Sequence, residues 1–334
     1  MKNSLKKLNS FGVESYCNEI YSLRSYENYL QIKKNLEKKK IIILGAGTNI
    51  LFKTKKLDYT ILKVDIDGIK IIEDNNENII VSVGAGVNWD DFVSWCVKNN
   101  YGGVENLTLI PGNVGSAPIQ NIGAYGSEIK DVIYSCEGFY LDSAEQKIFK
   151  KDECEFEYRS SIFKRNLKNK FLISKVNFRL SKKNHRINTS YKVLSDKLIE
   201  KGIKEPSIYD ISSLVKEIRQ KKLPNYNQLG NAGSFFKNPV LKKKNFEKIT
   251  NKYSSMPFYK ISENEYKLPA AWLIEKCGFK DICENQVGVY KNQSLVIINK
   301  GGATGSDIYN FSQKIKQEVR NKFDILLEEE VNII

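Results

Sequence analysis

The sequence predicts an α+β protein of two domains. Three observations support this class. Short β-branched runs alternate with glycine-rich turns in the first half, helical apolar patterns dominate after residue 183, and 334 residues exceed the usual size of one domain. The composition, 41% hydrophobic and 28% charged, is typical of a globular chain with a sizeable core. It excludes a mostly disordered chain, a collagen-like repeat and a disulfide-stapled miniprotein.

The first half is expected to consist of strands around one clear helix. Apolar residues recur at i, i+3, i+4 and i+7 between residues 89 and 96, and Asn88 precedes them as an N-cap. The strands are expected in β-branched or aromatic runs bounded by polar or glycine residues, namely 41–44, 59–64, 78–83, 139–141 and 171–180.

The second half is expected to be richer in helix. One apolar stripe follows Asp210, a candidate cap, and ends before Pro224. A second helix is expected within 268–279, with Gly278 as its stop, and a third from Ser306. Strands at 286–290 and 294–299 separate the last two helices. We place the domain boundary near residue 183.

Cysteine, histidine and charge usage exclude several classes of function. The six cysteines lie too far apart for a zinc site and are expected to be free structural thiols. The single histidine, His185, sits in a polar run and is expected to be solvated, so no metal site is expected. The formal charge of +14 is spread over unrelated lysine runs, such as 38–40 and 242–244, which favours solvated surfaces over a nucleic-acid interface.

No stretch reaches the roughly 18 apolar residues of a membrane helix. The basic start, MKNSLKKLNSFG, precedes no apolar segment of the signal-peptide kind. A cytoplasmic protein with neither a membrane nor a nucleic-acid partner is therefore expected.

Three glycine turns carry the strongest functional signal, at 41–52, 81–92 and 111–126. Backbone N–H groups of such turns bind phosphate oxygens where no Cβ blocks the approach. The first turn imitates a dinucleotide fingerprint with Asp65 downstream, but Ile50 replaces the third glycine and the following segment is too short for a crossover helix. Each turn alone is more often a tight turn without a ligand. Three together favour a bound phosphate-bearing cofactor.

Ordered motifs from about Phe11 to the C-terminus carry a family resemblance. They are LGAGTNILF, GAGVNWDDFV, IPGNVGSAPIQNIGAYGSEI, FEYRSSIFK, KLPN with GNAGSFFKNP, PAAWLIEKCGFK and LEEEVNII. The chain thereby resembles the UDP-N-acetylenolpyruvoylglucosamine reductases, flavin enzymes of bacterial cell-wall precursor synthesis, in the longer of their two types. The resemblance implies an FAD-binding PCMH-type domain, like that of vanillyl-alcohol oxidase, in two subdomains at 1–183. It further implies an α+β substrate-binding domain at 184–322 and a terminal strand at 323–334 that returns to the active site.

The resemblance also implies a reaction and its catalytic residues. NADPH reduces bound FAD, and hydride then passes from flavin N5 to an enolpyruvyl ether, UDP-N-acetylglucosamine enolpyruvate. The family pattern makes Arg159 the cation at the substrate, Ser234 the proton donor and Glu330 the terminal carboxylate. From the residues alone, Arg159 could be a surface arginine, Ser234 a turn serine bonded to its own backbone, and Glu330 part of a solvated acidic run.

Binding residues follow from the same motifs. The substrate is expected to contact Tyr191, Lys222 and Asn238, although Lys222 could equally face solvent, and the enzyme is expected to be a monomer. FAD is expected to contact Gly45, Ala46, Gly47, Thr48, Asn49, Pro111, Gly112, Gly115, Ser116, Gly123, Ala124 and Arg219.

Three residues depart from the family pattern. Ser160 replaces an acid beside Arg159, which raises the question of how Arg159 is oriented. Glu329 and Asn332 replace a proline and an arginine in the terminal motif, and could loosen the closing strand or a flavin contact.

Two other functions are alternatives to the reductase. A flavin oxidase with another substrate would have no reason to contain GNAGSFFKNP and the terminal glutamate. A basic nucleic-acid-binding protein would be colourless and salt-sensitive, and the scattered lysines argue against it.

Overall fold

A computed structural model describes residues 3–334 of the chain. Contacts divide it into two compact units. Of the described residues, unit 1 comprises 3, 17–46 and 58–219, and unit 2 comprises 4–16, 47–57 and 220–334. Segment 184–219 thus packs within unit 1, so the compact units divide elsewhere than at residue 183. The boundary at 183 between an FAD-binding and a substrate-binding domain stays a prediction.

Unit 1 contains two sheets. Strands β3 (Glu19–Leu23), β6 (Thr60–Val64) and β4 (Ile41–Leu44) form a parallel three-stranded sheet in that order, and helix α1 (Tyr26–Leu36) packs with it. The second sheet is antiparallel, with the order β12 (Gln146–Lys150), β11 (Ile133–Tyr140), β13 (Phe171–Ser181), β8 (Asn78–Gly84) and β7 (Ile69–Asp74). The expected strands at 41–44, 59–64, 78–83, 139–141 and 171–180 are confirmed within these elements.

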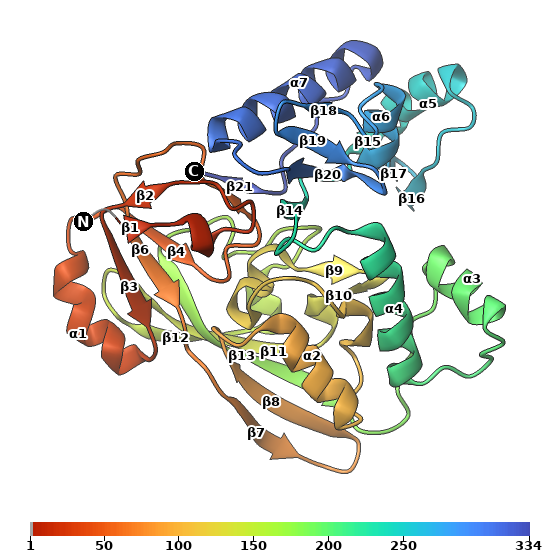
Figure 1. Ribbon diagram of the computed structural model, residues 1–334. Coiled ribbons are helices and arrows are strands. Elements are labelled where there is room, and N and C mark those ends of the chain that lie inside the picture. Colours follow the sequence, from red (N-terminus) through yellow and green to blue (C-terminus); the bar gives the residue numbers. More distant parts are fainter. Residues whose placement is uncertain (1–2) are drawn as a thin grey trace. The chain divides into compact units, whose positions relative to one another are not determined.

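Helix α2 (Trp89–Lys98) is positioned by its own sequence. Asn88 caps it, because its side-chain oxygen accepts from the N–H groups of Asp90 and Asp91. Its buried residues, Trp89 and Phe92 among them, pack into the core of the antiparallel sheet, and Figure 1 shows α2 lying against that sheet. The predicted helix and its N-cap are confirmed. The segment between β4 and β6 contains no helix, which confirms that the first glycine turn does not open a Rossmann unit.

Helices α3 (Lys192–Glu200) and α4 (Ile208–Lys222) form a small core of their own in unit 1. The predicted stripe of α4 is buried, but the cap assignment was wrong. Ser207 caps the helix: its hydroxyl accepts from Asp210 N–H, and the Asp210 carboxylate accepts from Ser207 in return. A capping box places the acid at the third helical position, three residues after the cap.

Unit 2 contains a four-stranded sheet of order β14 (Gly230–Ser234), β20 (Gln293–Asn299), β19 (Val287–Tyr290) and β18 (Cys283–Glu284). A three-stranded sheet has the order β15 (Val240–Lys242), β17 (Glu265–Lys267) and β16 (Tyr259–Ser262). Helices α5 (Lys243–Lys252), α6 (Ala270–Lys276) and α7 (Gly305–Phe323) accompany them (Figure 1). The helices expected within 268–279 and from about Ser306 are confirmed, as are the two strands between them.

The remaining short strands complete the topology. Strand β21 (Asn332–Ile333) pairs in parallel with β5 (Ile50–Leu51) in unit 2, and β10 (Ser127–Glu128) pairs with β9 (Gly123–Ala124) in unit 1. Strands β1 (Asn3–Ser4) and β2 (Tyr16–Cys17) form a further two-stranded sheet. Among residues 3–334, no helix combines the length and apolarity that crossing a bilayer requires.

Cysteines and histidine occupy ordinary structural places. All six cysteines are free thiols, and four of them are buried, as predicted. His185 is not simply solvated: its ring is half-buried and forms hydrogen bonds with the side chains of Ser181 and Asn100. The polar run around it folds back onto the end of β13, which sequence pattern alone does not reveal.

Candidate active site

The first glycine turn, between β4 and β5, presents an unusual row of donors. The backbone N–H groups of Gly45, Ala46, Gly47 and Thr48 donate no hydrogen bond to any residue in the described part of the chain. Four consecutive unsatisfied N–H groups form an anion-binding concavity, because each partial positive charge lacks an internal acceptor. This is the arrangement that a pyrophosphate requires, so the turn fits the expected FAD.

Within unit 1 the three glycine-rich segments meet. Gly115 donates to the Ala85 carbonyl at 2.9 Å, and a Cβ added to Gly115 would lie only 2.4 Å from the Ala85 Cβ. Trp89 N–H bonds the Gly112 carbonyl at 3.0 Å. A Cβ on Gly45 would come within 4 Å of Asn113 and Ser116. The small residues therefore allow the three turns to approach one another closely, as the cofactor hypothesis requires.

The third segment is more regular than expected. Within what the sequence presents as a glycine turn, it contains two 3-10 turns, Val114–Ser116 and Pro118–Gln120, and then β9. Gly112, with a φ of 133°, leads into the first turn. The N–H groups of Gly112 and Asn113 also donate no hydrogen bond within residues 3–334 and can join the donor row.

Arg159 lies at the corner of a tight turn closed by two backbone hydrogen bonds between Glu157 and Ser160. Its φ of 53° is in the left-handed region, which a non-glycine residue occupies at a cost. Its guanidinium donates to the carbonyls of Gly123 at 2.7 Å and Asn121 at 3.4 Å. Carbonyls of the third glycine segment thus orient Arg159, and an acid at position 160 is not required for this.

The Ser160 substitution is accommodated locally. The Ser160 hydroxyl accepts a hydrogen bond of 2.7 Å from Arg165, whose guanidinium also pairs with Glu155. Asn121, which is fully buried, donates to the Glu157 carbonyl and so ties the Arg159 turn to the third glycine segment. Asn121 is a positioning residue that pattern analysis missed, although it lies in the NIGAYG motif.

A second cationic position lies beside β9. Burial lowers the pKa of Arg219 on α4, and the interaction with Tyr125, whose phenol pKa burial raises, opposes that shift. The Arg219 Nε is buried without a hydrogen-bond partner among the described residues. The ring of Tyr125 meets that of Tyr191 edge-on at 5.3 Å. The structure therefore brings together the predicted residues Arg219 and Tyr191 through Tyr125, which the sequence analysis did not single out.

Within unit 2, Ser234 and Glu330 lie on adjoining segments. Glu330 N–H donates to the Phe235 carbonyl at 2.8 Å, and Phe236 forms a β-bridge with Glu329. Asn49 of the first glycine turn donates to the Glu330 carbonyl at 3.3 Å. The cofactor turn and the serine segment are thus both hydrogen-bonded to main-chain atoms of Glu330, through the Asn49 side chain and the Phe235 carbonyl, although Glu330 lies 96 positions after Ser234 in the sequence.

Ser234 is half-buried and follows Gly233, whose φ is 69°. The Ser234 hydroxyl makes no hydrogen bond within residues 3–334, so it is not a turn serine bonded to its own backbone. Of the predicted substrate contacts, Lys222 is exposed at the end of α4. Asn238 accepts from Ala270 N–H at 2.9 Å and so completes the start of α6.

The terminal substitutions do not loosen the closing strand. Asn332 Nδ2 donates to the Asn49 carbonyl at 3.0 Å, which adds to the backbone pairing of β21 with β5. Glu329 accepts from Lys316 at 2.7 Å and from Gln313 at 3.0 Å. Burial raises the pKa of Glu329, but these hydrogen bonds and the charge of Lys316 outweigh burial, and the net pKa is lowered.

The interaction between Glu329 and Lys316 predicts that the stability of the fold depends on pH. The pKa of Glu329 is lower in the folded state than in the unfolded chain, where a glutamate has a pKa of about 4.3. The ionised carboxylate therefore stabilises the fold fully above that unfolded pKa, and this stabilisation is lost as pH falls through the folded pKa. E329Q is expected to lower the free energy of unfolding by about 1 kcal/mol at pH 7, and the difference should shrink towards pH 3. Urea unfolding at a series of pH values measures it. E318Q on the exposed side of α7 serves as the matched control, and an E329Q deficit that persists unchanged at pH 3 would contradict the assignment.

Two family models match separate parts of the chain. A family model described as FAD binding domain matches residues 32–140, and one described as UDP-N-acetylenolpyruvoylglucosamine reductase, C-terminal domain, matches residues 224–334. The UDP-N-acetylenolpyruvoylglucosamine reductase of Flavobacterium johnsoniae is 46% identical over 99% of this chain and 98% of its own length. That of Amoebophilus asiaticus is 42% identical over 99% and 97%.

The fold is also shared with a solved structure. The crystal structure of the UDP-N-acetylenolpyruvylglucosamine reductase from Thermus caldophilus aligns over 100% of this chain and 99% of its own, with a TM-score of 0.69 and 18% identity. The predicted α+β class, an FAD-binding domain followed by a separate C-terminal domain, is confirmed. With relatives above 40% identity along nearly its whole length, the chain belongs to the UDP-N-acetylenolpyruvoylglucosamine reductase family.

Proposed function

We propose that this protein reduces UDP-N-acetylglucosamine enolpyruvate to UDP-N-acetylmuramate in the cytoplasm, with NADPH as the electron source. The observation that carries the proposal is the junction in unit 2. There the first glycine turn, the Ser234 segment and Glu330 are linked through Asn49 and Phe235. The proposal is supported by this linkage, because it joins the segments that carry Ser234 and Glu330 to a turn with unsatisfied backbone donors in a chain of this reductase family.

The cofactor is held by backbone N–H groups and a buried cation. Gly45 to Thr48 and Gly112 to Asn113 supply the donors for the pyrophosphate, and Arg219 supplies a charge beside β9. The bound flavin, once reduced by NADPH, would supply the hydride for the enolpyruvyl carbon. The residues we assign to the cofactor are those named from the sequence motifs, together with Asn113.

Arg159 stabilises the substrate's negative charge. Reduction of an enolpyruvyl group builds charge on the carbon next to a carboxylate, and a fixed planar cation stabilises such charge. The carbonyls of Asn121 and Gly123 hold the guanidinium before substrate arrives, so little reorganisation is needed. Tyr191, Lys222 and Asn238 bind the nucleotide part of the substrate in this proposal.

Ser234 donates the proton that completes the reaction. A serine hydroxyl is a weak acid, but it can protonate a strongly basic carbanion when it is shielded from water. Ser234 lies next to Phe235 and Phe236, which are buried, and its hydroxyl is not engaged by another described residue. Glu330 shares a proton with the developing enolic carboxylate.

The visible spectrum tests the proposed activity. The purified protein is expected to be yellow, to lose its flavin absorbance on anaerobic addition of NADPH, and to regain it when UDP-N-acetylglucosamine enolpyruvate is added. NADH run in parallel measures the nicotinamide preference. A bleached sample that ignores the ether would instead indicate a flavin enzyme with another substrate.

A further inference from the structure

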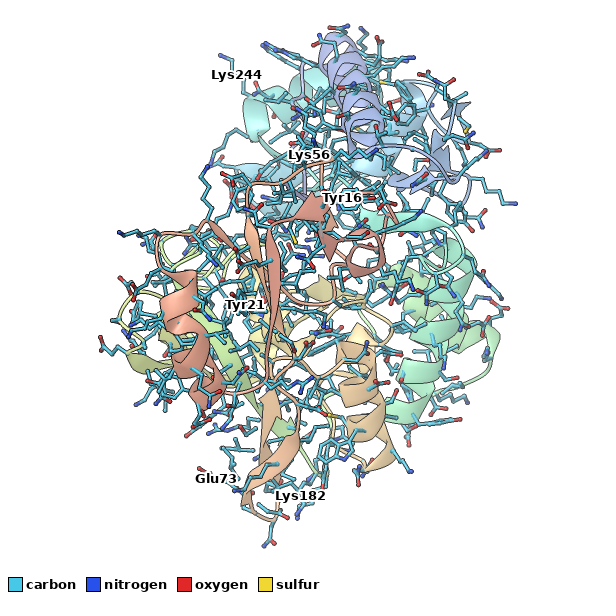
Figure 2. All side chains as sticks on the ribbon, turned by 60° about the vertical axis from the view of Figure 1, so that its left-hand side comes forward. Tyr16, Tyr21, Lys56, Glu73, Lys182 and Lys244 are labelled. Carbon is cyan, nitrogen blue, oxygen red and sulfur yellow. The ribbon has the colours of Figure 1, made fainter. Side chains whose placement is uncertain are left out.

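The outer face of α5 in unit 2 carries an unpaired row of lysines. Lys244, Lys248 and Lys252 follow one another at i, i+4 and i+8, and all are exposed. The residues that α5 buries, Phe246 and Ile249, lie outside this row. In the described part of the chain none of the three forms an ion pair, and Figure 2 shows Lys244 extending outward from the ribbon. The row spans about 12 Å along the helix.

Beyond Lys252 lies a cluster of three aromatic residues, at the ends of α5 and α7 and in the first turn of α6. Tyr253 follows α5, Trp272 lies on α6, and Phe323 ends α7. Their ring centroids lie 5.2 to 5.8 Å apart. Each ring has a lysine beside it: Lys252 at 5.8 Å from Tyr253, Lys276 at 5.6 Å from Trp272 and Lys322 at 5.9 Å from Phe323.

The exposed lysines of this region are here called the lysine face, defined as Lys244, Lys248, Lys252, Lys276 and Lys322. Residues 242–253 contain five lysines and one glutamate, so this helix concentrates the basic excess that the sequence spreads more evenly elsewhere. Lys322 also donates to the Lys276 carbonyl, which neutralises a helix C-terminus. That structural role does not account for Lys244 and Lys248, which lie in the first half of α5.

The side chains of the lysine face suit an anionic membrane surface better than a single-stranded nucleic acid. Single-stranded nucleic acids bind through aromatic faces on which bases stack, but Trp272 and Tyr253 are half-buried and engaged with each other and with the neighbouring lysines. Lysines act as point charges and do not form the bidentate contacts that arginine makes with individual phosphates. A planar anionic surface requires only a row of such charges.

We propose that the lysine face docks onto an anionic phospholipid bilayer, so that the enzyme binds reversibly to the membrane surface. This revises the expectation of no membrane partner. The proposal does not rest on the assigned activity, because no residue of the lysine face is among the catalytic or binding residues above.

Vesicle co-sedimentation of the FAD-loaded protein tests the proposal. Wild type is expected to bind vesicles of 30% phosphatidylglycerol in phosphatidylcholine and to ignore pure phosphatidylcholine. Binding should weaken as salt rises from 50 to 500 mM, because the attraction is screened. K244E/K248E/K252E should reduce the partition coefficient on the order of 100-fold, since each basic residue near an anionic surface contributes several-fold.

The matched control is K70E/K168E/K204E, which makes the same charge change at three exposed lysines of unit 1. It should bind vesicles nearly as wild type does, because only general charge attraction is lost. Flavin absorbance and reductase turnover, unchanged in both variants, show that each is folded. Equal loss in the two triple variants, binding to uncharged vesicles, or binding to RNA with none to anionic vesicles would overturn the proposal.

Discussion

Ser234→Ala is expected to slow the reduction of the enolpyruvyl ether by on the order of 100- to 10,000-fold, the range that loss of a positioned proton donor produces. Bleaching of the flavin absorbance by NADPH should stay within about twofold of wild type, because no proton from Ser234 is needed in that step. Stopped-flow absorbance measures the two half-reactions separately. The change removes only a hydroxyl that has no partner within residues 3–334, so the fold should tolerate it.

Two further variants sharpen this result. Ser234→Cys keeps a proton on the side chain and should recover part of the lost rate, with a changed pH profile, since a thiol is more acidic than a hydroxyl. Ser294→Ala removes a hydroxyl from the neighbouring strand β20, where it bonds Glu275 at 2.8 Å, and should leave both half-reactions nearly intact. If Ser234→Ala slows both half-reactions equally, the serine positions the cofactor and does not donate the proton.

The fold was most predictable where sequence signals are local. The core strands β8 and β13 have β-branched or aromatic runs. Helix α2 has an apolar stripe at helical spacing, and the residue that caps the helix directly precedes that stripe. Helix α1 was missed because its polar sequence buries only Tyr29 and Leu36 fully, although Ser25 caps it. Strand β16 was missed because all four of its residues are exposed. Such elements are held by tertiary contacts more than by their own pattern.

The site was predictable in its parts but not in its connections. Glycine turns are visible in the sequence, and the family motifs name Ser234 and Glu330. The hydrogen bond between Glu330 and Phe235 joins residues 95 apart, and nothing local specifies that pairing. The orientation of Arg159 likewise depends on the carbonyls of Asn121 and Gly123, more than 35 residues earlier. Every residue has a backbone carbonyl, so the sequence does not reveal which carbonyls hold Arg159.

Gly47→Ala is expected to lower the free energy of unfolding more than the other glycine substitutions described below. A Cβ at Gly47 would lie 1.9 Å from the Leu8 carbonyl oxygen and 2.8 Å from its carbon. The φ of 68° adds the cost of a left-handed alanine. The neighbouring segment cannot easily move away, because Ser10 N–H bonds the Gly47 carbonyl at 3.0 Å. Together these terms predict a loss of about 2 to 5 kcal/mol in the free energy of unfolding.

Two other glycines separate the causes of that loss. Gly202→Ala shares a positive φ of 67° but has open space around the new Cβ, so it isolates the backbone cost of about 1 to 2 kcal/mol. Gly45→Ala, in the same turn as Gly47, has no positive φ and only ordinary contacts beyond 3.7 Å, and should be nearly neutral for unfolding. Urea unfolding of the three variants, with FAD content measured alongside, is expected to show the largest loss in free energy of unfolding for Gly47→Ala. Gly202→Ala should show a smaller loss and Gly45→Ala the smallest. Equal losses at Gly47 and Gly202 would mean that the loop around Leu8 relaxes, and the close approach would then not be what requires glycine at position 47.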